Sequence, residues 1–220
     1  LPMRVYHHTS FFKETIHIIP RPRPDSRKLA KAIEKLKSAK RPLIISGGGV
    51  KYSLAGETVG NFASSCGIPL CETIAGKGTV IHYHPAYVGG IGVTGSSSAN
   101  AMAASADVIL AIGTRLQDFT TGSWTNFAEN AEFISINTAR WDAVKHRAID
   151  VVGDALETIQ EIEARIGGWC APQGWIAKGR EEMKTWDDLL NEKQRPTNAS
   201  VPSYLVFQRN NSYNTTTPPR

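Results

Sequence analysis

The chain of 220 residues is long enough for one large domain with extensions and short for two complete domains. Apolar residues make up 41% and charged residues 20%, a balance typical of folded proteins, and no apolar stretch reaches the roughly 18 residues that a membrane span needs. Much of the net charge of +5 lies in one basic stretch, residues 27–41, which we interpret as the solvated face of a helix, with a polyanion site as the alternative. We therefore expect neither nucleic acid nor a membrane as a partner.

The cysteines and histidines predict no disulfide framework and no metal site. Cys66, Cys71 and Cys170 form no C-x-x-C pair, and an odd number of thiols without a secretory segment is typical of the reducing cytoplasm, where we expect the protein. His82 and His84 form an H-x-H pair, but their neighbours supply no third or fourth ligand for zinc.

The N-terminal part of the chain predicts an arm, a helix and a strand. Residues 1–24 end in the stiff sequence PRPRP and are interpreted as a linker or arm. Asp25 is placed as an N-cap, and apolar residues then recur at helical spacing as far as Ala39. The apolar run at residues 42–46 predicts a buried strand, and Gly47–Gly49 predict a tight turn after it.

The rest of the domain predicts further alternation of helices and strands. Residues 73–95 are rich in glycine with weak periodicity, so we expect mostly loop, at one edge of the sheet. Asp154 is expected to cap a last helix that Gly167 ends. The other expected elements, in chain order, are a helix near 53–66, a strand at 67–72, a helix at 96–106, and strands at 107–112, 132–137 and 148–152.

Short apolar strands that alternate with amphipathic helices are typical of parallel strands covered on both faces. We therefore predict an α/β fold with an open, doubly wound, mostly parallel, Rossmann-like sheet over residues 25–168. Ligands of such sheets bind outside the carboxyl ends of the strands. Three turns leave predicted strands on that side and are expected to converge: Gly47–Gly49, Gly92–Ser96 and Gly113–Gly122.

The composition changes after the predicted domain. Residues 174–194 repeat apolar side chains at helical spacing, which predicts a docked helix within a linker at 169–204. Residues 205–220, LVFQRNNSYNTTTPPR, contain little that could form a core, and we expect a disordered, non-native tail. Our hypothesis for this tail is a truncated or frameshifted gene product.

Two kinds of residue in the three turns are candidates for ligand contact. Gly47, Gly48 and Gly49 would let backbone N–H groups approach an anion, with a purely structural turn as the alternative. Arg115 is suited to clamp a phosphate or carboxylate, and Asp118 to accept ribose hydroxyl bonds, unless the two pair with each other or with loop carbonyls. No Ser-His-Asp or Cys-His arrangement has a recognisable spacing, so no catalytic residue is predicted.

Four stretches of the sequence resemble the central domain of thiamine-diphosphate-dependent enzymes, the family of acetolactate synthase and pyruvate decarboxylase: RPLIISGGGV, GIPLCETIAGKGTVIHYHPAYVGGIGVTG, ADVILAIGTRLQDFTTGSW and FISINTARWDAVKH. The details of AGKG, GVTG and GTRLQDFTTGS, followed by DAVKH, are most similar to the acylhydrolases that open the trihydroxycyclohexane-dione ring in myo-inositol breakdown. The resemblance extends over residues 10–203.

The resemblance implies that the chain is a fragment of a larger C–C bond hydrolase. A complete subunit of this family also has a pyrimidine-binding domain, which carries a cofactor-activating glutamate, and a diphosphate-binding domain, where Gly-Asp-Gly and a later Asn-Asn hold Mg²⁺. Gly153-Asp154-Ala155 lacks the final glycine and the asparagine pair, so this chain alone is expected to bind neither thiamine diphosphate nor Mg²⁺. The two missing domains are its expected partners, in an enzyme expected to be a homo-oligomer.

In flavin-containing relatives the glycine turns and a G-x-R-x-D-D-R-x-x-G loop of this domain hold FAD. Arg115 and Asp118 match that loop, whereas Gln117, Phe119 and Thr94 stand where the flavin enzymes have Asp, Arg and His. These departures argue against FAD. Three other hypotheses stay open: a FAD- or ADP-binding central domain of an acetolactate-synthase-like enzyme, an oligomerisation scaffold, and a stand-alone FAD- or ADP-binding module. The last would use Gly47, Gly48, Gly49, Thr94, Arg115 and Asp118.

Overall fold

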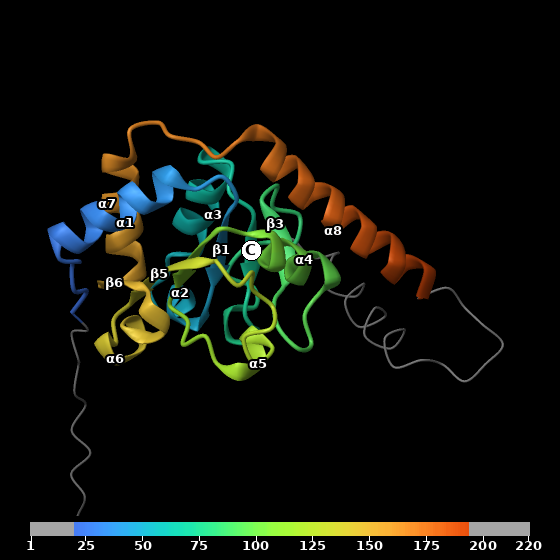
Figure 1. Ribbon diagram of the computed structural model, residues 1–220, viewed down its shortest axis with the longest axis horizontal. Helices are drawn as coiled ribbons and strands as arrows, with labels where there is room; N and C mark the ends of the chain where they lie inside the picture. Colours follow the sequence, from blue (N-terminus) through green and yellow to red (C-terminus); the bar gives the residue numbers. More distant parts are fainter. Residues whose placement is uncertain (1–19, 194–220) are drawn as a thin grey trace, which may run out of the picture.

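The computed structural model describes residues 20–193 of the chain (Figure 1). The predicted arm at residues 1–24 lies outside this range except for residues 20–24, and the predicted tail at residues 205–220 lies outside it entirely. The division of the chain into arm, domain, linker and tail therefore stays a prediction.

Six parallel strands form one sheet in the order β3-β2-β1-β4-β5-β6. Ile44 in β1 lies opposite Leu70 of β2 on one side and Leu110 of β4 on the other, so β1 and β4 are the two central strands. The chain starts at the centre of the sheet and winds outward in both directions, which confirms the predicted open, doubly wound, Rossmann-like fold. The strands are β1 (Pro42–Ser46), β2 (Leu70–Glu72), β3 (Tyr87–Gly90), β4 (Val108–Ile112), β5 (Glu132–Asn137) and β6 (Ile149–Val152).

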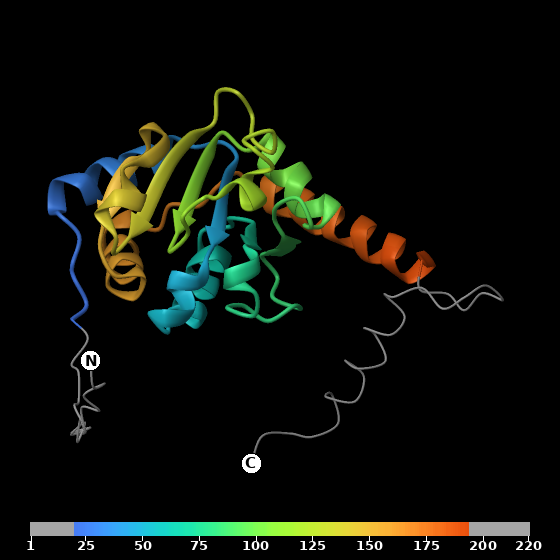
Figure 2. The ribbon, with the colours of Figure 1, turned by 90° about the horizontal axis from the view of Figure 1, so that it is seen from below.

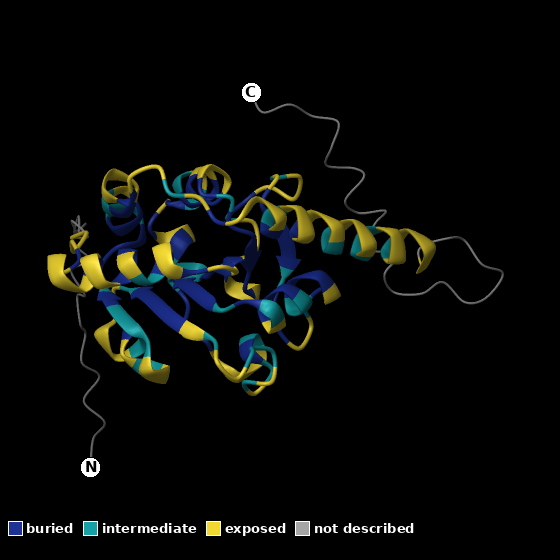
Figure 3. Ribbon diagram, turned by 45° about the horizontal axis from the view of Figure 1, so that its top comes forward, coloured by how far each residue is buried: buried dark blue, intermediate teal, exposed yellow. Residues whose placement is uncertain are grey.

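Helices cover both faces of the sheet, and strand side chains alternate between two apolar cores. Ile44 belongs to the core under α1, α3 and α7, whereas Leu43 and Ile45 belong to the core under α4 and α8. Figure 2 shows α3 and α4 on opposite sides of the sheet, and Figure 3 shows the buried strands between helices with exposed outer faces. None of the helices in residues 20–193 has the length and apolarity that crossing a membrane requires. The longer helices are α1 (Ser26–Ser38), α3 (Gly56–Ser65), α4 (Ser97–Ser105), α7 (Ala155–Ile166) and α8 (Gln173–Lys193).

Side-chain caps explain where α1, α4 and α7 begin. Asp25, Ser96 and Asp154 each precede a helix and accept hydrogen bonds from backbone N–H groups of its first turn. Gly167, at φ +68°, ends α7 in the left-handed conformation that favours glycine. The predicted starts of α1 and α7 are confirmed.

The segment predicted as mostly loop, residues 73–95, contains a strand that the sequence analysis missed. This strand, β3, lies at one edge of the sheet, as expected for the segment. Gly89 and Gly90 make up its second half, and glycine is disfavoured in strands, which hid the pattern. Gly89 is needed there because its φ is +102° and the Oγ of Ser96 lies 2.1 Å from where a Cβ would be.

Several short helices were also missed. Gly48 and Gly49, predicted as part of a tight turn, form the first turn of a helix, and α3 begins at Gly56 rather than near residue 53. Elements of three to five residues are too short to show a helical period in the sequence, which explains these differences. The short elements are α2 (Gly48–Tyr52), α5 (Asp118–Thr121), α6 (Arg140–Ala143) and the 3₁₀ turns η1 (Ile74–Gly76) and η2 (Lys145–Arg147).

One tryptophan and one glycine hold α8 against the sheet. The buried Trp175 donates a hydrogen bond from its Nε1 to the backbone oxygen of Pro42, at 2.7 Å. Gly179 allows the helix to approach Val88 and Pro69, since a Cβ at this position would lie 3.1 Å from a Val88 methyl carbon. The C-terminal half of α8 extends beyond the sheet (Figure 1).

Candidate functional site

The turns after β1 and β4 form the centre of the candidate site. The strand order reverses between these two strands, and parallel sheets bind ligands at such a switch point. Gly47 donates its backbone N–H to the oxygen of Ile112, at 2.8 Å, and Gly49 donates to the oxygen of Gly113, at 2.9 Å. The first and third of the predicted turns are therefore bonded directly to each other.

The glycines in these two turns are required by packing. A Cβ on Gly47 would lie 2.4 Å from the oxygen of Gly113, and a Cβ on Gly49 would lie 2.6 Å from the Cα of Gly113. Gly113 itself has a φ of +59°. These distances leave no room for a side chain at Gly47 or Gly49, so a structural role is sufficient to explain these two glycines.

The second predicted turn, Gly92–Ser96, contacts the third turn, Gly113–Gly122. The backbone N–H of Val93 donates to the oxygen of Phe119, at 2.9 Å. A Cβ on Gly92 would lie 2.3 Å from that same oxygen. All three turns thus converge at the carboxyl edge of the sheet, with Gly113–Gly122 in the middle.

A cavity of about 460 Å³ opens between the first and third turns and the segment that follows β2. Three of the predicted site residues line it, namely Gly48, Gly49 and Arg115. Gly47 and Asp118 do not line the cavity. Gly47 is buried, and Asp118 is exposed at the start of α5. The remaining lining residues are Tyr52, Thr73, Ile74, Ala75, Gly113, Thr114, Gln117, Phe119 and Thr120.

Arg115 pairs with a carboxylate, although not with Asp118. Its Nε lies 3.6 Å from Oδ2 of Asp142 in α6, and Asp142 also accepts a hydrogen bond from Lys145 at 2.6 Å. The interpretation in which Arg115 and Asp118 pair with each other is therefore wrong. The Arg115 side chain is 63% exposed, which leaves its guanidinium able to reach a ligand in the cavity.

Thr94 lines a neighbouring cavity of about 470 Å³. Thr73 and Ile74 line both cavities, so the two lie side by side. The wall of this second cavity is formed by the edge strand β3 and by Met183, Trp186 and Leu190 of α8. Of the six predicted site residues, three therefore line the first cavity, Thr94 lines the second, and Gly47 and Asp118 line neither.

The second cavity also contains polar residues that the sequence analysis missed. Glu72 is buried at the end of β2, and its carboxylate accepts hydrogen bonds from Thr79 Oγ1 at 2.7 Å and from the Val80 amide at 2.9 Å. Lys77 Nζ donates to the phenol oxygen of Tyr87 at 3.0 Å, while burial raises the pKa of that phenol. Its position as a charged residue at the end of an apolar strand is the signal that could have identified Glu72 in the sequence.

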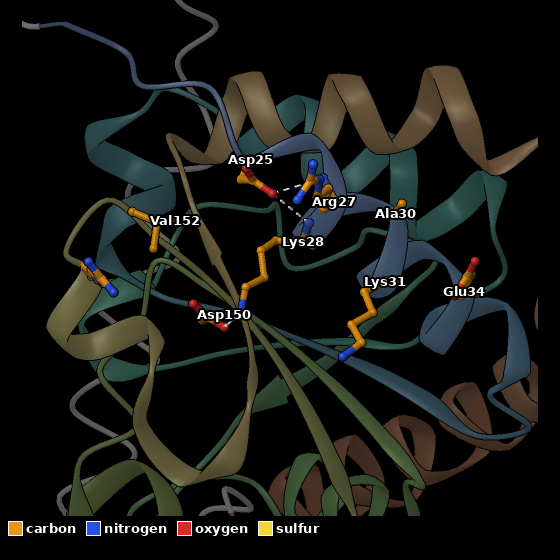
Figure 4. Close-up of a pocket in the computed structure, with 9 residues that line it drawn as sticks. Asp25, Arg27, Lys28, Ala30, Lys31, Glu34, Asp150 and Val152 are labelled. Carbon is orange, nitrogen blue, oxygen red and sulfur yellow. Dashed lines mark hydrogen bonds and ion pairs between the residues drawn. The ribbon is translucent and has the colours of Figure 1, made fainter.

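Another hollow, with a volume of about 950 Å³, lies between α1 and β6 (Figure 4). Lys28 forms an ion pair with Asp150 across this hollow. The Asp25 carboxylate accepts hydrogen bonds from backbone N–H groups in the first turn of α1. Lys35 forms a further ion pair with Glu132. These ion pairs offset part of the positive charge of α1, which supports the interpretation of the basic stretch as a solvated helix face.

The described residues do not fit Mg²⁺ or a diphosphate bound to it. Among residues 20–193, no three His, Cys, Asp or Glu side chains are grouped in a way that could hold a metal ion. Asp154 caps α7 and accepts hydrogen bonds from Ser53 Oγ at 2.7 Å and Arg21 Nη1 at 3.1 Å. Burial alone would raise the pKa of Asp154, but these hydrogen bonds and the one from the Glu157 amide together lower it. Its carboxylate therefore stabilises the helix start, in a structural role.

Comparisons with known proteins show which proteins the chain resembles. Residues 29–162 match the family described as "Thiamine pyrophosphate enzyme, central domain". The chain is 41% identical over 157 residues to the 3D-(3,5/4)-trihydroxycyclohexane-1,2-dione hydrolase of Clostridium perfringens strain ATCC 13124, which covers 71% of this chain and 25% of that protein. It is 40% identical to the hydrolase of the same name from Bacillus licheniformis over 203 residues. This aligned segment is 92% of this chain and 30% of that protein.

A solved structure from Mycobacterium smegmatis, described as a thiamin diphosphate-dependent enzyme, has a similar fold. The TM-score is 0.59 at 19% sequence identity, over 71% of this chain and 30% of that one. This likeness shows the fold alone. The chain thus spans between a quarter and a third of the length of these relatives.

Proposed function

The chain belongs to the central-domain family of thiamine pyrophosphate enzymes, and from this premise we propose that it serves as the central domain of a hydrolase that opens 3D-(3,5/4)-trihydroxycyclohexane-1,2-dione. The observation that carries the proposal is the 41% identity, over 157 residues, with a hydrolase of that name. A C–C bond is broken in this ring opening, as a step of inositol degradation in the cytoplasm.

In this proposal the chain supplies a folded scaffold, and the catalytic groups belong to other domains. In the complete enzyme, thiamine diphosphate and Mg²⁺ would be held by pyrimidine- and diphosphate-binding domains, as the resemblance to the family implies. Those two domains are its partners, and the complete enzyme is a homo-oligomer. The division into an arm at 1–24, a domain at 25–168, a linker at 169–204 and a tail at 205–220 is part of the same proposal.

A domain exchange tests this function. Residues 20–193 replace the matching segment of the complete Clostridium perfringens hydrolase, and ring opening of the dione is measured with thiamine diphosphate and Mg²⁺ present. We expect a rate within about tenfold of the parent enzyme, equivalent to about 1.4 kcal/mol in the activation barrier. The control is the parent enzyme with the same segment deleted, which should be inactive. A folded exchange protein that binds thiamine diphosphate but leaves the ring closed would contradict the proposal.

A second candidate function is nucleotide binding, with ADP or FAD held by Gly48, Gly49 and Arg115; of the other residues predicted for this role, Gly47 and Asp118 do not line the cavity and Thr94 lines the neighbouring one. The cavity between the turns after β1 and β4 supports it, because Gly48, Gly49 and the exposed Arg115 lie around one hollow at the switch point of the sheet. The exposed guanidinium would then bind a phosphate of the ligand.

Calorimetric titration of the chain with ADP tests this second function. If the nucleotide binds, replacing Arg115 with alanine should weaken it by at least about tenfold, since a charge-assisted hydrogen bond is lost. Arg27→Ala, which removes an exposed arginine from α1, is the matched control and should leave binding unchanged. Heat signals that show no saturation at millimolar ADP would remove this candidate.

A further inference from the structure

Two of the three cysteines lie beside each other at the amino edge of the sheet, opposite the candidate site. Cys66 is the C-cap of α3 and comes just before β2 begins. Cys170 lies in the connection between α7 and α8, which passes the end of α3 (Figure 1). Residues that are 104 positions apart in the sequence are thus brought together by the fold.

Backbone geometry limits how far apart the two cysteines lie. The N–H of Ala171 donates to the oxygen of Cys66, at 2.8 Å. Standard bond lengths then keep the Cα atoms of residues 66 and 170 within roughly 8 Å of each other. The thiol of Cys170 donates to the oxygen of Ser65, the residue before Cys66, at 3.1 Å. A disulfide joins Cα atoms about 4.4–6.8 Å apart, so a small shift of the connection is sufficient to form one.

The connection between α7 and α8 has room for this shift. Gly167 and Gly168 have φ angles of +68° and +70°, and no atom lies within 4 Å of where a Cβ on Gly168 would be. Residues 169–172 belong to no helix or strand. A connection without regular structure and with open surroundings moves at a low cost in free energy.

The three cysteines differ in their access to a reagent in solution. Cys170 is exposed, whereas Cys66 is 3% exposed and Cys71 is fully buried. The thiol of Cys71 donates to the oxygen of Ile44 within the sheet, at 3.4 Å. A reagent in solution therefore reaches Cys170 first, and the thiol next to Cys170 is that of Cys66.

We propose that Cys66 and Cys170 form a reversible modification site, at which a small disulfide of the glutathione type oxidises the two thiols to an intramolecular disulfide. The Cys170 thiolate attacks one sulfur of the small disulfide and releases its other half as a thiolate. The Cys66 thiolate then attacks Sγ of Cys170 and releases the second half. The two protons lost by the cysteines pass to the two small thiolates, so one small disulfide is reduced as one protein disulfide forms.

The environment of Cys66 makes the second step the slower one. Burial raises the pKa of the Cys66 thiol to about 11, a hydrogen bond from Ser65 lowers it, and the charges of a Cys170 thiolate and of Glu163 raise it. The charge of Cys170 is absent once Cys170 carries the small thiol. Because only the thiolate attacks, the closing step should accelerate as the pH rises toward this pKa.

The new bond would tie the start of α8 to the end of α3. It closes a loop of about 100 residues, a length at which a cross-link removes much conformational entropy from the unfolded chain. Disulfides that form in a reducing compartment are usually transient and respond to redox conditions. The pair is therefore suited to hold the connection before α8 more firmly under oxidising conditions.

Peptide mapping of the oxidised 220-residue chain tests the proposal. The chain is treated with oxidised glutathione, free thiols are alkylated, and tryptic peptides are analysed by mass spectrometry without reduction. We expect a disulfide between peptides 52–77 and 166–178 in a monomeric chain, and its loss after reduction with dithiothreitol. Cys71→Ala is the matched control, since Cys71 shares a tryptic peptide with Cys66, and the link should persist in this variant. Cys170→Ser, which changes an exposed side chain, should abolish the link.

Urea unfolding measures what the bond does to the fold. In the Cys71→Ala variant, the midpoint should rise by at least about 1 M urea on oxidation and return on reduction. A midpoint that falls on oxidation would overturn the proposal, because the bond would then require distortion of the fold. Two further results would also overturn it: glutathione that stays on Cys170 while Cys66 is alkylated, and cross-links found only between two chains.

Discussion

Replacing Gly47 with alanine is expected to lower the free energy of unfolding by about 3 kcal/mol, the upper part of the range for overpacking a buried site. The new Cβ would lie 2.4 Å from the oxygen of Gly113 and 2.6 Å from the Cβ of Thr114. Neither neighbour is the end of a flexible side chain, so the turns after β1 and β4 must move apart. Urea unfolding followed by circular dichroism measures the change.

Gly48→Ala is the matched control for this substitution. A Cβ on Gly48 would lie 3.3 Å from the Cβ and the oxygen of Ala75, a contact that a small shift can relieve. We expect a loss below about 1 kcal/mol, partly offset by the higher helix propensity of alanine in α2. Similar losses at positions 47 and 48 would show that the close approach of the two turns is not what requires Gly47.

The largest expected effect of removing a side chain is at Trp175. Trp175→Ala should lower the free energy of unfolding by about 4 kcal/mol, because a buried aromatic ring is lost and a cavity remains between α8 and the sheet. Trp175 is 5% exposed, and its Nε1 donates to the oxygen of Pro42 at 2.7 Å. Circular dichroism in urea gives the free energy, and limited proteolysis shows whether α8 separates from the sheet.

Trp175→Phe separates the two contributions at this position. It keeps an aromatic ring but removes the N–H donor, so the expected loss is about 1–2 kcal/mol. If the two variants were equally stable, the hydrogen bond to Pro42 would account for the whole effect. If proteolysis cut the chain within α8 no faster in Trp175→Ala, Trp175 would not be what holds the helix.

The sequence predicted the parts of this fold that carry a strong periodic signal. The apolar run Pro42–Ser46 and the caps Asp25 and Asp154 lie where they were expected, since each depends on neighbouring residues only. The edge strand β3 was missed because Gly89 and Gly90 weaken its pattern, while its conformation depends on the contact with Ser96. Local pattern is therefore sufficient for the central strands and insufficient at the edge.

The candidate site was predicted in position but not in detail. The three glycine turns converge because carboxyl ends of parallel strands share one edge, a rule that needs only the strand assignment. The partner of Arg115 was missed because Asp142 belongs to a distant connection, whose place beside the third turn depends on the order of β4, β5 and β6. Partners of this kind follow from the topology, which the sequence alone did not specify.

The hydrogen bond between Trp175 and Pro42 links the first strand of the sheet to one of the last described parts of the chain. A ribosome releases β1 long before α8, and β1 also needs β4 as its neighbour in the sheet. During synthesis, the apolar side chains of Leu43 and Ile45 therefore stay uncovered until most of the domain has emerged. The first strand to be synthesised is therefore among the last to be fully covered, and a nascent chain stalled before α8 still exposes apolar surface that can aggregate.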